Sequence, residues 1–157
     1  MIKKIIIILA VFLAGCTSNK TLKHPLDKSK SKTVVLENGL KVYLLSDPSF
    51  NVSAASVSVE VGSLDNPDDR QGLAHFLEHM LFLGTEKYPD VDEYSSYLKT
   101  YGGYSNAYTA SDHTNYQFQV LPDGFEGALD RFSQFFISPL FTEEYTAREV
   151  NLSLIHI

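Results

Sequence analysis

The sequence is poor in cysteine and in basic residues. Cys16 is the only cysteine among 157 residues, so no disulfide bond can form within the chain. The 13 lysine and arginine residues are outnumbered by 19 aspartate and glutamate residues, which gives a formal net charge of −6. This charge, together with the lack of a stripe of basic and aromatic residues, argues against general nucleic-acid binding.

Long apolar runs are missing as well. Residues 5–14 form an apolar run of ten residues, which is too short to span a bilayer comfortably. The run follows Lys3 and Lys4, and this order is typical of a cleavable signal peptide. The remaining composition, 44% apolar and 20% charged, is that of a globular protein with one domain and a core of its own.

The segment Leu13-Ala14-Gly15-Cys16 resembles the lipobox of bacterial lipoproteins. The resemblance implies that residues 1–15 are a signal peptide and that Cys16 is acylated. Thr17 follows the cysteine, which in Gram-negative lipoproteins is typical of release to the outer membrane. We therefore expect a lipid-anchored protein of the bacterial cell envelope, facing the periplasm. An ordinary secretory signal with an incidental cysteine is the alternative.

Residues 16–32 are rich in lysine and nearly devoid of large apolar side chains. This composition is typical of a flexible, solvated tether, so we place the domain at residues 33–157. The tether lysines could also contact anionic lipid headgroups.

Alternating and turn patterns predict an antiparallel sheet. Asn38-Gly39 separates two apolar strands, residues 34–36 and 40–45, because both turn residues tolerate a positive φ. Residues 52–61 alternate between apolar and polar side chains, as a half-buried strand does. Further strands are predicted at 105–109 and at 115–120, where Tyr116, Phe118 and Val120 share one face.

Four helices are predicted, and the fold class is α+β with a mainly antiparallel sheet and helices packed on one face. The first helix runs from Leu73 to Leu83, is closed by Gly84, and is expected to be buried because apolar residues nearly encircle it. The second begins at a capping box of Asp90 and Glu93, and the fourth begins at Thr142. The third helix has an expected core face of Phe125, Leu129, Phe132 and Phe136.

The stretch His75-Phe76-Leu77-Glu78-His79 carries a metal-binding pattern on the first helix. His75 and His79 share one helix face and can bind one metal ion, while Glu78 lies beside that face as a general base. A catalytic zinc site normally takes a third protein ligand. Glu143, Glu144 and Glu149, on the last helix, are the candidates.

Several motifs in the same order resemble the insulysin and pitrilysin family of zinc metallopeptidases, over residues 34–151. They are Gly72 to Thr85, Ser105-Asn106-Ala107-Tyr108-Thr109, His113-Thr114-Asn115-Tyr116, Glu126 to Phe132, and Arg148-Glu149-Val150-Asn151. The resemblance implies the N-terminal part of a zinc peptidase catalytic domain, which hydrolyses peptides or small unfolded proteins with one Zn²⁺ per site.

By this resemblance, His75 and His79 match the zinc ligands and Glu78 matches the catalytic base. Glu149 matches an acidic residue that supports the site from outside the metal's ligand shell. Asn106 and Ala107 match the residues of an edge strand that pairs with the substrate backbone. A plain sheet strand is the alternative for that segment. His24 and His113, outside these motifs, are interpreted as linker and structural residues, and Asp130 and Arg131 as solvated surface charges.

The family's third zinc ligand is a glutamate seven residues after the position of Glu149, and His156 stands there in this chain. Residues 152–157 depart from the family pattern and match one reading frame of a common sequencing adapter. We therefore expect a truncated chain whose C-terminal domains are missing, and a fragment that is itself inactive.

Two other functions remain open from the sequence. The first is a non-catalytic peptide-binding or scaffold lipoprotein of the same fold, although such domains usually lose one of the residues matching His75, Glu78 and His79. The second is a short lipoprotein that binds metal through His75, His79 and His156.

Overall fold

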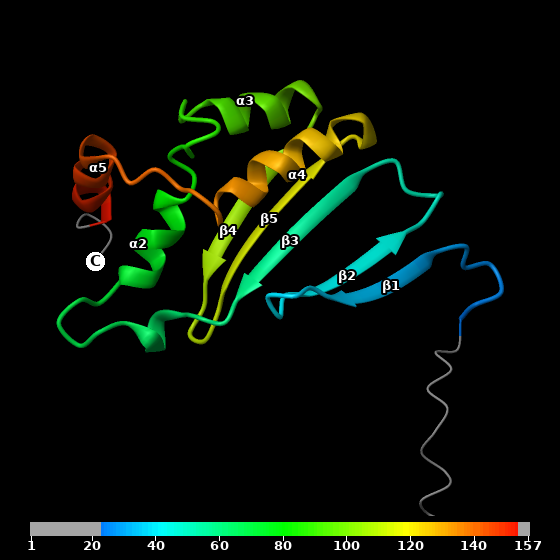
Figure 1. Cartoon of the computed structure of the whole chain (residues 1–157), viewed down its shortest axis with the longest axis horizontal. Helices are drawn as coiled ribbons and strands as arrows, with labels where there is room; N and C mark the ends of the chain where they lie inside the picture. The colour runs from blue at the N-terminus through cyan, green and yellow to red at the C-terminus, as the bar shows by residue number, and fades with distance from the viewer. Residues whose placement is uncertain (1–22, 154–157) are drawn as a thin grey trace, which may run out of the picture. The chain divides into compact units, whose positions relative to one another are not determined.

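The computed structural model describes residues 23–153, and the chain divides into two compact units at Ser49. In the first unit, β1 (Lys30–Val35) pairs with β2 (Lys41–Ser46) as an antiparallel hairpin (Figure 1). The predicted Asn38-Gly39 turn is confirmed, but only Gly39 takes a positive φ, of 86°. The N–H of Gly39 donates to the carbonyl of Leu36 at 2.9 Å, which closes the turn.

The hairpin begins earlier than the apolar pattern predicts. Lys30 pairs with Ser46 and Lys32 with Leu44, so the first strand includes residues that the composition assigns to the tether. The reason is that ladder hydrogen bonds join backbone groups, and apolar periodicity does not detect them when the side chains are polar.

The second unit, residues 50–157, contains a three-stranded antiparallel sheet with the order β3-β5-β4. Its strands are β3 (Ser53–Val59), β4 (Tyr104–Thr109) and β5 (Thr114–Val120). The central strand β5 pairs along its whole length with both neighbours, so that Tyr116 lies opposite Val57 on one side and Ala107 on the other. All three predicted strands are confirmed, and β4 forms one edge of this sheet.

Helices cover one face of the sheet (Figure 1). The α-helices are α2 (Leu73–Met80), α3 (Glu93–Thr100), α4 (Phe125–Gln134) and α5 (Glu143–Ser153), with short 3₁₀ turns η1 (Ser63–Asp65) and η2 (Pro122–Gly124). The predicted α+β class is therefore confirmed. Within residues 23–153, no helix is long and apolar enough to cross a membrane.

The core lies between the sheet and helices α3 and α4. Buried side chains of β5 pack against buried side chains of both helices. They are Tyr116, Phe118 and Val120 from β5, Tyr94 and Leu98 from α3, and Ala128 and Phe132 from α4, with Phe135 just after α4. The predicted inward face of α4 is wrong in part, because Leu129 is 41% exposed and Phe136 is 39% exposed. The buried residues Ala128, Phe132 and Phe135 also have the spacing of a helix face, and Phe132 belongs to both this set and the predicted one. Apolar periodicity alone therefore does not show which of the two sets faces the core.

Two charged residues of α4 are bound to neighbours rather than solvated. Arg131 forms a two-pronged ion pair with Glu93, with its Nη2 at 2.6 Å from Oε1, and its guanidinium lies over the rings of Tyr88 and Tyr97. Glu93 is therefore not the capping-box partner of Asp90, and Asp92 is the N-cap of α3. Local helix patterns do not reveal such an ion pair, because its two residues lie in elements that are distant in sequence.

Asp130 is the second of these residues. Its carboxylate accepts hydrogen bonds from Lys87 at 2.7 Å and from the Tyr88 hydroxyl at 2.5 Å. These two bonds, that of Lys87 first, lower the pKa of Asp130 below its ordinary value. Asp130 and Arg131 thus fasten α4 to the segment that follows α2.

Candidate metal centre

Helix α2 carries the predicted metal ligands and is held at both ends. At its start, the N–H of Ala74 donates to the side-chain oxygen of Asn66 at 2.9 Å. At its end, Met80 is buried, and the chain turns out of the helix through Gly84, whose φ of 101° favours glycine. The helix stops three residues before the predicted Leu83, because the N–H groups of Phe82 and Leu83 donate to carbonyls three residues back, those of His79 and Met80, as in a 3₁₀ turn.

The prediction that α2 is buried all round is wrong. Leu73 and Leu77 are each 44% exposed, whereas Glu78 and Met80 are buried. The helix contacts β4, β5, η1 and α5, and Leu73 and Leu77 lie on a part of its surface that these elements leave exposed. A buried carboxylate between two exposed imidazoles is the feature that distinguishes this surface.

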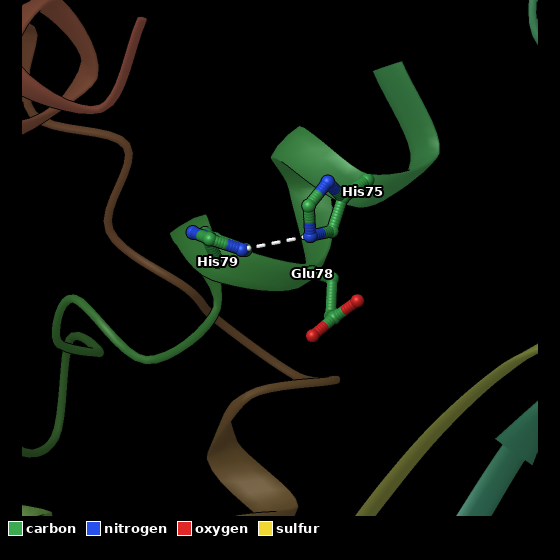
Figure 2. Close-up of side chains that lie close together, drawn as sticks. All are labelled: His75, Glu78 and His79. Atoms are coloured by element: carbon green, nitrogen blue, oxygen red, sulfur yellow. Dashed lines mark hydrogen bonds between the residues drawn. The ribbon is translucent and has the colours of Figure 1, made fainter. Parts of the chain in front are cut away.

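The two histidines turn the same ring atom toward each other (Figure 2). Their Nε2 atoms lie 3.0 Å apart, and Glu78 projects from the same helix beside them. One ligand atom from each of His75, Glu78 and His79 lies within 4.8 Å of the other two. Two imidazole nitrogens that share a tetrahedral zinc ion would be roughly 3.3 Å apart, given zinc–nitrogen bonds of about 2.0–2.1 Å. The observed pair needs only a small adjustment to reach that geometry.

Glu149 of α5 contacts the outer nitrogen of His79. Its Oε1 lies 2.5 Å from Nδ1 of His79, and its side chain is only 12% exposed. A carboxylate can only accept a hydrogen bond, so Nδ1 carries the proton and Nε2 presents its lone pair to the site. This arrangement fixes the orientation of the His79 ring, as a carboxylate partner does for metal-binding histidines.

Glu78 is held by a hydroxyl group from the sheet. Oγ1 of Thr109, the last residue of β4, donates to Oε2 of Glu78 at 2.6 Å. The hydroxyl of Thr114, the first residue of β5, donates to the carbonyl of Val61 at 2.8 Å. The buried ring of Tyr116 lies nearby, and burial and then the charge of Glu78 raise the pKa of Tyr116 to about 12.

A cleft of about 670 Å³ is lined in part by His75, Glu78 and His79. The remaining lining residues come from η1 and its following loop and from β4, and are Ser63, Asn66, Gln71, Gly72, Asn106, Ala107, Tyr108 and Thr109. Asn106 and Ala107 thus lie in the same cleft as the histidines, on the edge strand of the sheet. An edge strand offers unpaired backbone groups to an extended chain beside it.

Of the three glutamates considered as a third ligand, only Glu149 lies at the site, and it contacts the outer side of His79. Glu144 instead pairs with Arg148 at 2.6 Å and is solvent-exposed. Glu143 is exposed at the start of α5. Cys16 and His156 lie outside the described residues. The imidazole and carboxylate donors that are present suit zinc.

The predicted residues omit three members of the site. Thr109 could have been found from strand alternation, since it shares the inward parity of Ala107 and Ser105. Thr114 likewise shares the parity of Tyr116 on β5. The side chain of Asn66 accepts from the first turn of α2, eight positions further along the chain, and no local pattern indicates such a contact.

Comparisons with known proteins indicate a family for this chain. The family described as "Insulinase (Peptidase family M16)" matches residues 41–156. Human insulin-degrading enzyme is 52% identical over 133 residues, which cover 85% of this chain and 13% of the relative. A Schizosaccharomyces pombe protein named as a zinc protease is 53% identical over 125 residues, covering 80% of this chain and 13% of the relative.

The fold is likewise similar to that of a solved peptidase. The crystal structure of pitrilysin matches with a TM-score of 0.77 and 39% identity, covering 84% of this chain and 14% of that chain. This chain therefore spans about an eighth of the length of the curated relatives that it matches.

Proposed function

The chain belongs to the insulinase family of peptidases, peptidase family M16, and from this premise we propose that it carries the zinc-binding histidines and the general base of a metalloendopeptidase. The family is one of metallopeptidases, and its cofactor is zinc. The observation that carries the proposal is the facing pair of Nε2 atoms, 3.0 Å apart, with the buried carboxylate of Glu78 beside them in a cleft.

Each residue has a separate task in the proposed reaction. When bound, zinc supplies a Lewis acid that activates water and polarises the peptide carbonyl. His75 and His79 would hold it through Nε2, and Glu149 fixes the orientation of His79. Glu78 takes the proton of the attacking water and later gives it to the leaving amine, as a general base and then a general acid.

The ligand set of this chain is incomplete by the family pattern. We propose that the described residues form a two-histidine half-site, and that hydrolysis needs the further glutamate expected where His156 stands. A two-ligand site binds zinc more weakly than a three-ligand site, so this chain by itself is expected to be inactive.

The substrate is proposed to be an extended peptide. β4 is an edge strand, and its residues Asn106 and Ala107 line the cleft that contains the histidines. A peptide that pairs with β4 would gain backbone hydrogen bonds that do not depend on its sequence. Peptides and small unfolded proteins can adopt that shape, and folded proteins cannot without opening.

Attachment to the cell envelope remains a proposal from the sequence. Support comes from the lipobox-like residues that end at Cys16, from the apolar run before them and from the lysine-rich segment 16–32. Metabolic labelling with a fatty acid, compared between the unsubstituted chain and Cys16→Ser, tests this proposal. Label that persists in Cys16→Ser would contradict it.

Zinc titration of the purified chain tests the central proposal. We expect one zinc per chain, and a loss of affinity of about 100-fold or more in both His75→Ala and His79→Ala, since each removes a ligand. His113→Ala is the matched control, because that histidine contacts Asp112 and Tyr108 instead. Equal losses in all three variants, or no zinc binding by the unsubstituted chain, would favour the non-catalytic scaffold.

The same titration examines position 156. If His156→Ala leaves the affinity unchanged, the two-histidine half-site is supported. If His156→Ala abolishes binding as His75→Ala does, the chain has a three-histidine site and the half-site proposal is wrong.

A further inference from the structure

Glu78 is close enough to the two histidines to become a metal ligand itself. A carboxylate oxygen of Glu78 lies within 4.8 Å of a ring nitrogen of each histidine. Glutamate has three side-chain torsions, so a modest rotation would bring that oxygen into bonding distance of a shared ion. A carboxylate with its lone pairs on the metal would no longer be free to take a proton from water.

The hydroxyl of Thr109 opposes that rotation. It donates to Oε2 of Glu78 at 2.6 Å from the last residue of β4, which is paired with Thr114 of β5. Glu78 is 6% exposed, so water does not readily replace this donor. Breaking the bond would leave a buried carboxylate without its observed side-chain partner, which favours the position seen in the structure.

The direction of this hydrogen bond follows from the acceptors that surround the hydroxyl of Thr109. Thr114 lies 3.4 Å from Thr109 through their hydroxyl oxygens, but its single proton points to the carbonyl of Val61 at the shorter distance of 2.8 Å. Thr109 thus has two acceptors within reach, the charged oxygen of Glu78 at 2.6 Å and the neutral oxygen of Thr114 at 3.4 Å, and its proton goes to the nearer, charged one. A carboxylate accepts and cannot donate, so the contact is a charge-assisted hydrogen bond from the hydroxyl.

From this geometry we propose that Thr109 is a positioning residue that keeps Glu78 out of the metal's ligand shell. The proposal rests on the proposed function, since it takes zinc to be held by His75 and His79. It assigns different roles to side chains of one helix. The histidines would bind the metal, while the hydroxyl of Thr109 keeps the carboxylate of Glu78 beside them free for proton transfer.

Metal affinity tests the proposal without any measurement of activity. Thr109→Val keeps the shape of the side chain and removes the donor, so Glu78 becomes free to bind the metal. We expect zinc affinity to rise about 10-fold, because a third ligand joins the site. With Co²⁺ as the probe, the visible absorption spectrum should change as an oxygen ligand is added. Thr109→Ser, which restores the hydroxyl, should return both properties to those of the unsubstituted chain.

Glu78→Gln provides a second test that does not depend on the folding of Thr109→Val. If Glu78 is held away from the metal, Glu78→Gln should change zinc affinity less than about 2-fold, since no ligand is lost. Combined with Thr109→Val, it should also abolish the gain in affinity. A 10-fold loss in Glu78→Gln alone would show that Glu78 is already a ligand and would overturn the proposal.

The failures of the two proposals are distinguishable. If the unsubstituted chain binds no zinc, or binds it independently of His75, the proposed function fails and this inference fails with it. If zinc binds through both histidines but a folded Thr109→Val variant keeps the original affinity and Co²⁺ spectrum, only the role of Thr109 is wrong. Circular dichroism of each variant establishes that it is folded.

Discussion

The two sides of the metal centre are built differently. On one side, α2 is anchored by the buried Met80 and Leu81, and its Glu78 is bonded to the sheet through Thr109. On the other side lies α5, in which no residue from 143 to 150 is buried. Its link to the site is the contact of Glu149 with His79. The first side is a consequence of core packing, whereas α5 lies beside α2 with residues 143–150 at least partly exposed and reaches the site through Glu149.

This difference has a physical consequence for how each side responds to change. Buried packing holds its residues through many contacts, and removing one large side chain affects the whole unit. A polar contact between two side chains is local, and its energy depends on the charges of its two partners and on salt. Substitutions in the packed side of α2 should therefore change zinc affinity and the free energy of unfolding together. Substitutions on the α5 side should change zinc affinity without changing the free energy of unfolding.

The largest expected effect comes from the packed side. Phe132→Ala removes a side chain that is 1% exposed and lies against Phe118. We expect a loss of about 3–5 kcal/mol in the free energy of unfolding, measured by urea denaturation, and a parallel loss of zinc binding. Leu129→Ala on the same helix is the control, with an expected loss of about 1 kcal/mol or less, because that side chain is partly exposed. Equal losses in the two variants would contradict the observed orientation of α4.

The α5 side gives the next effect. Glu149→Ala should weaken zinc binding by about 10–100-fold, as is typical when a partner of a metal-binding histidine is removed. The free energy of unfolding without metal should change little. Glu144→Ala on the same helix, whose carboxylate pairs with Arg148, is the matched control and should leave zinc affinity unchanged. If Glu149→Ala unfolds the unit, the two sides are not independent as described.

A smaller effect is expected at the start of α2. Asn66→Ala removes the acceptor for the N–H of Ala74 and should cost about 1 kcal/mol of stability, the usual value for a helix cap. Because His75 is the next residue, zinc affinity should fall slightly as well. The exposed Asn51 is the control residue, and Asn51→Ala should be neutral. Thermal denaturation with and without zinc measures both effects.

The smallest effect belongs to the surface of α5. Arg148→Ala removes the exposed ion pair with Glu144, one helical turn away. Pairs of this kind contribute about 0.3–0.5 kcal/mol, so stability should change within that range and zinc affinity should not change. A large loss of zinc affinity in this variant would mean that α5 is positioned by more than its contact at Glu149.

Much of the fold follows from local patterns. The strands β3 and β5 were predictable because their apolar residues alternate, and one face of each meets the core. The orientation of α4 was not predictable, because two overlapping sets of residues have the spacing of a helix face and the sheet selects one of them. The ion pair of Glu93 with Arg131 joins residues 38 apart in sequence, beyond the reach of any helix pattern.

The metal centre shows the same division. The spacing of His75 and His79 on a helix was enough to bring their rings to one side, because residues four apart share a helix face. The sequence by itself therefore determined the two facing imidazoles, the adjacent carboxylate and the strand β4 that lines the cleft. Only the tertiary structure decided that Glu149 meets His79 across 70 residues and that Thr109 holds Glu78 across 31. The physical reason is that local spacing fixes which side chains share a face, whereas contacts between elements depend on how the core packs them together.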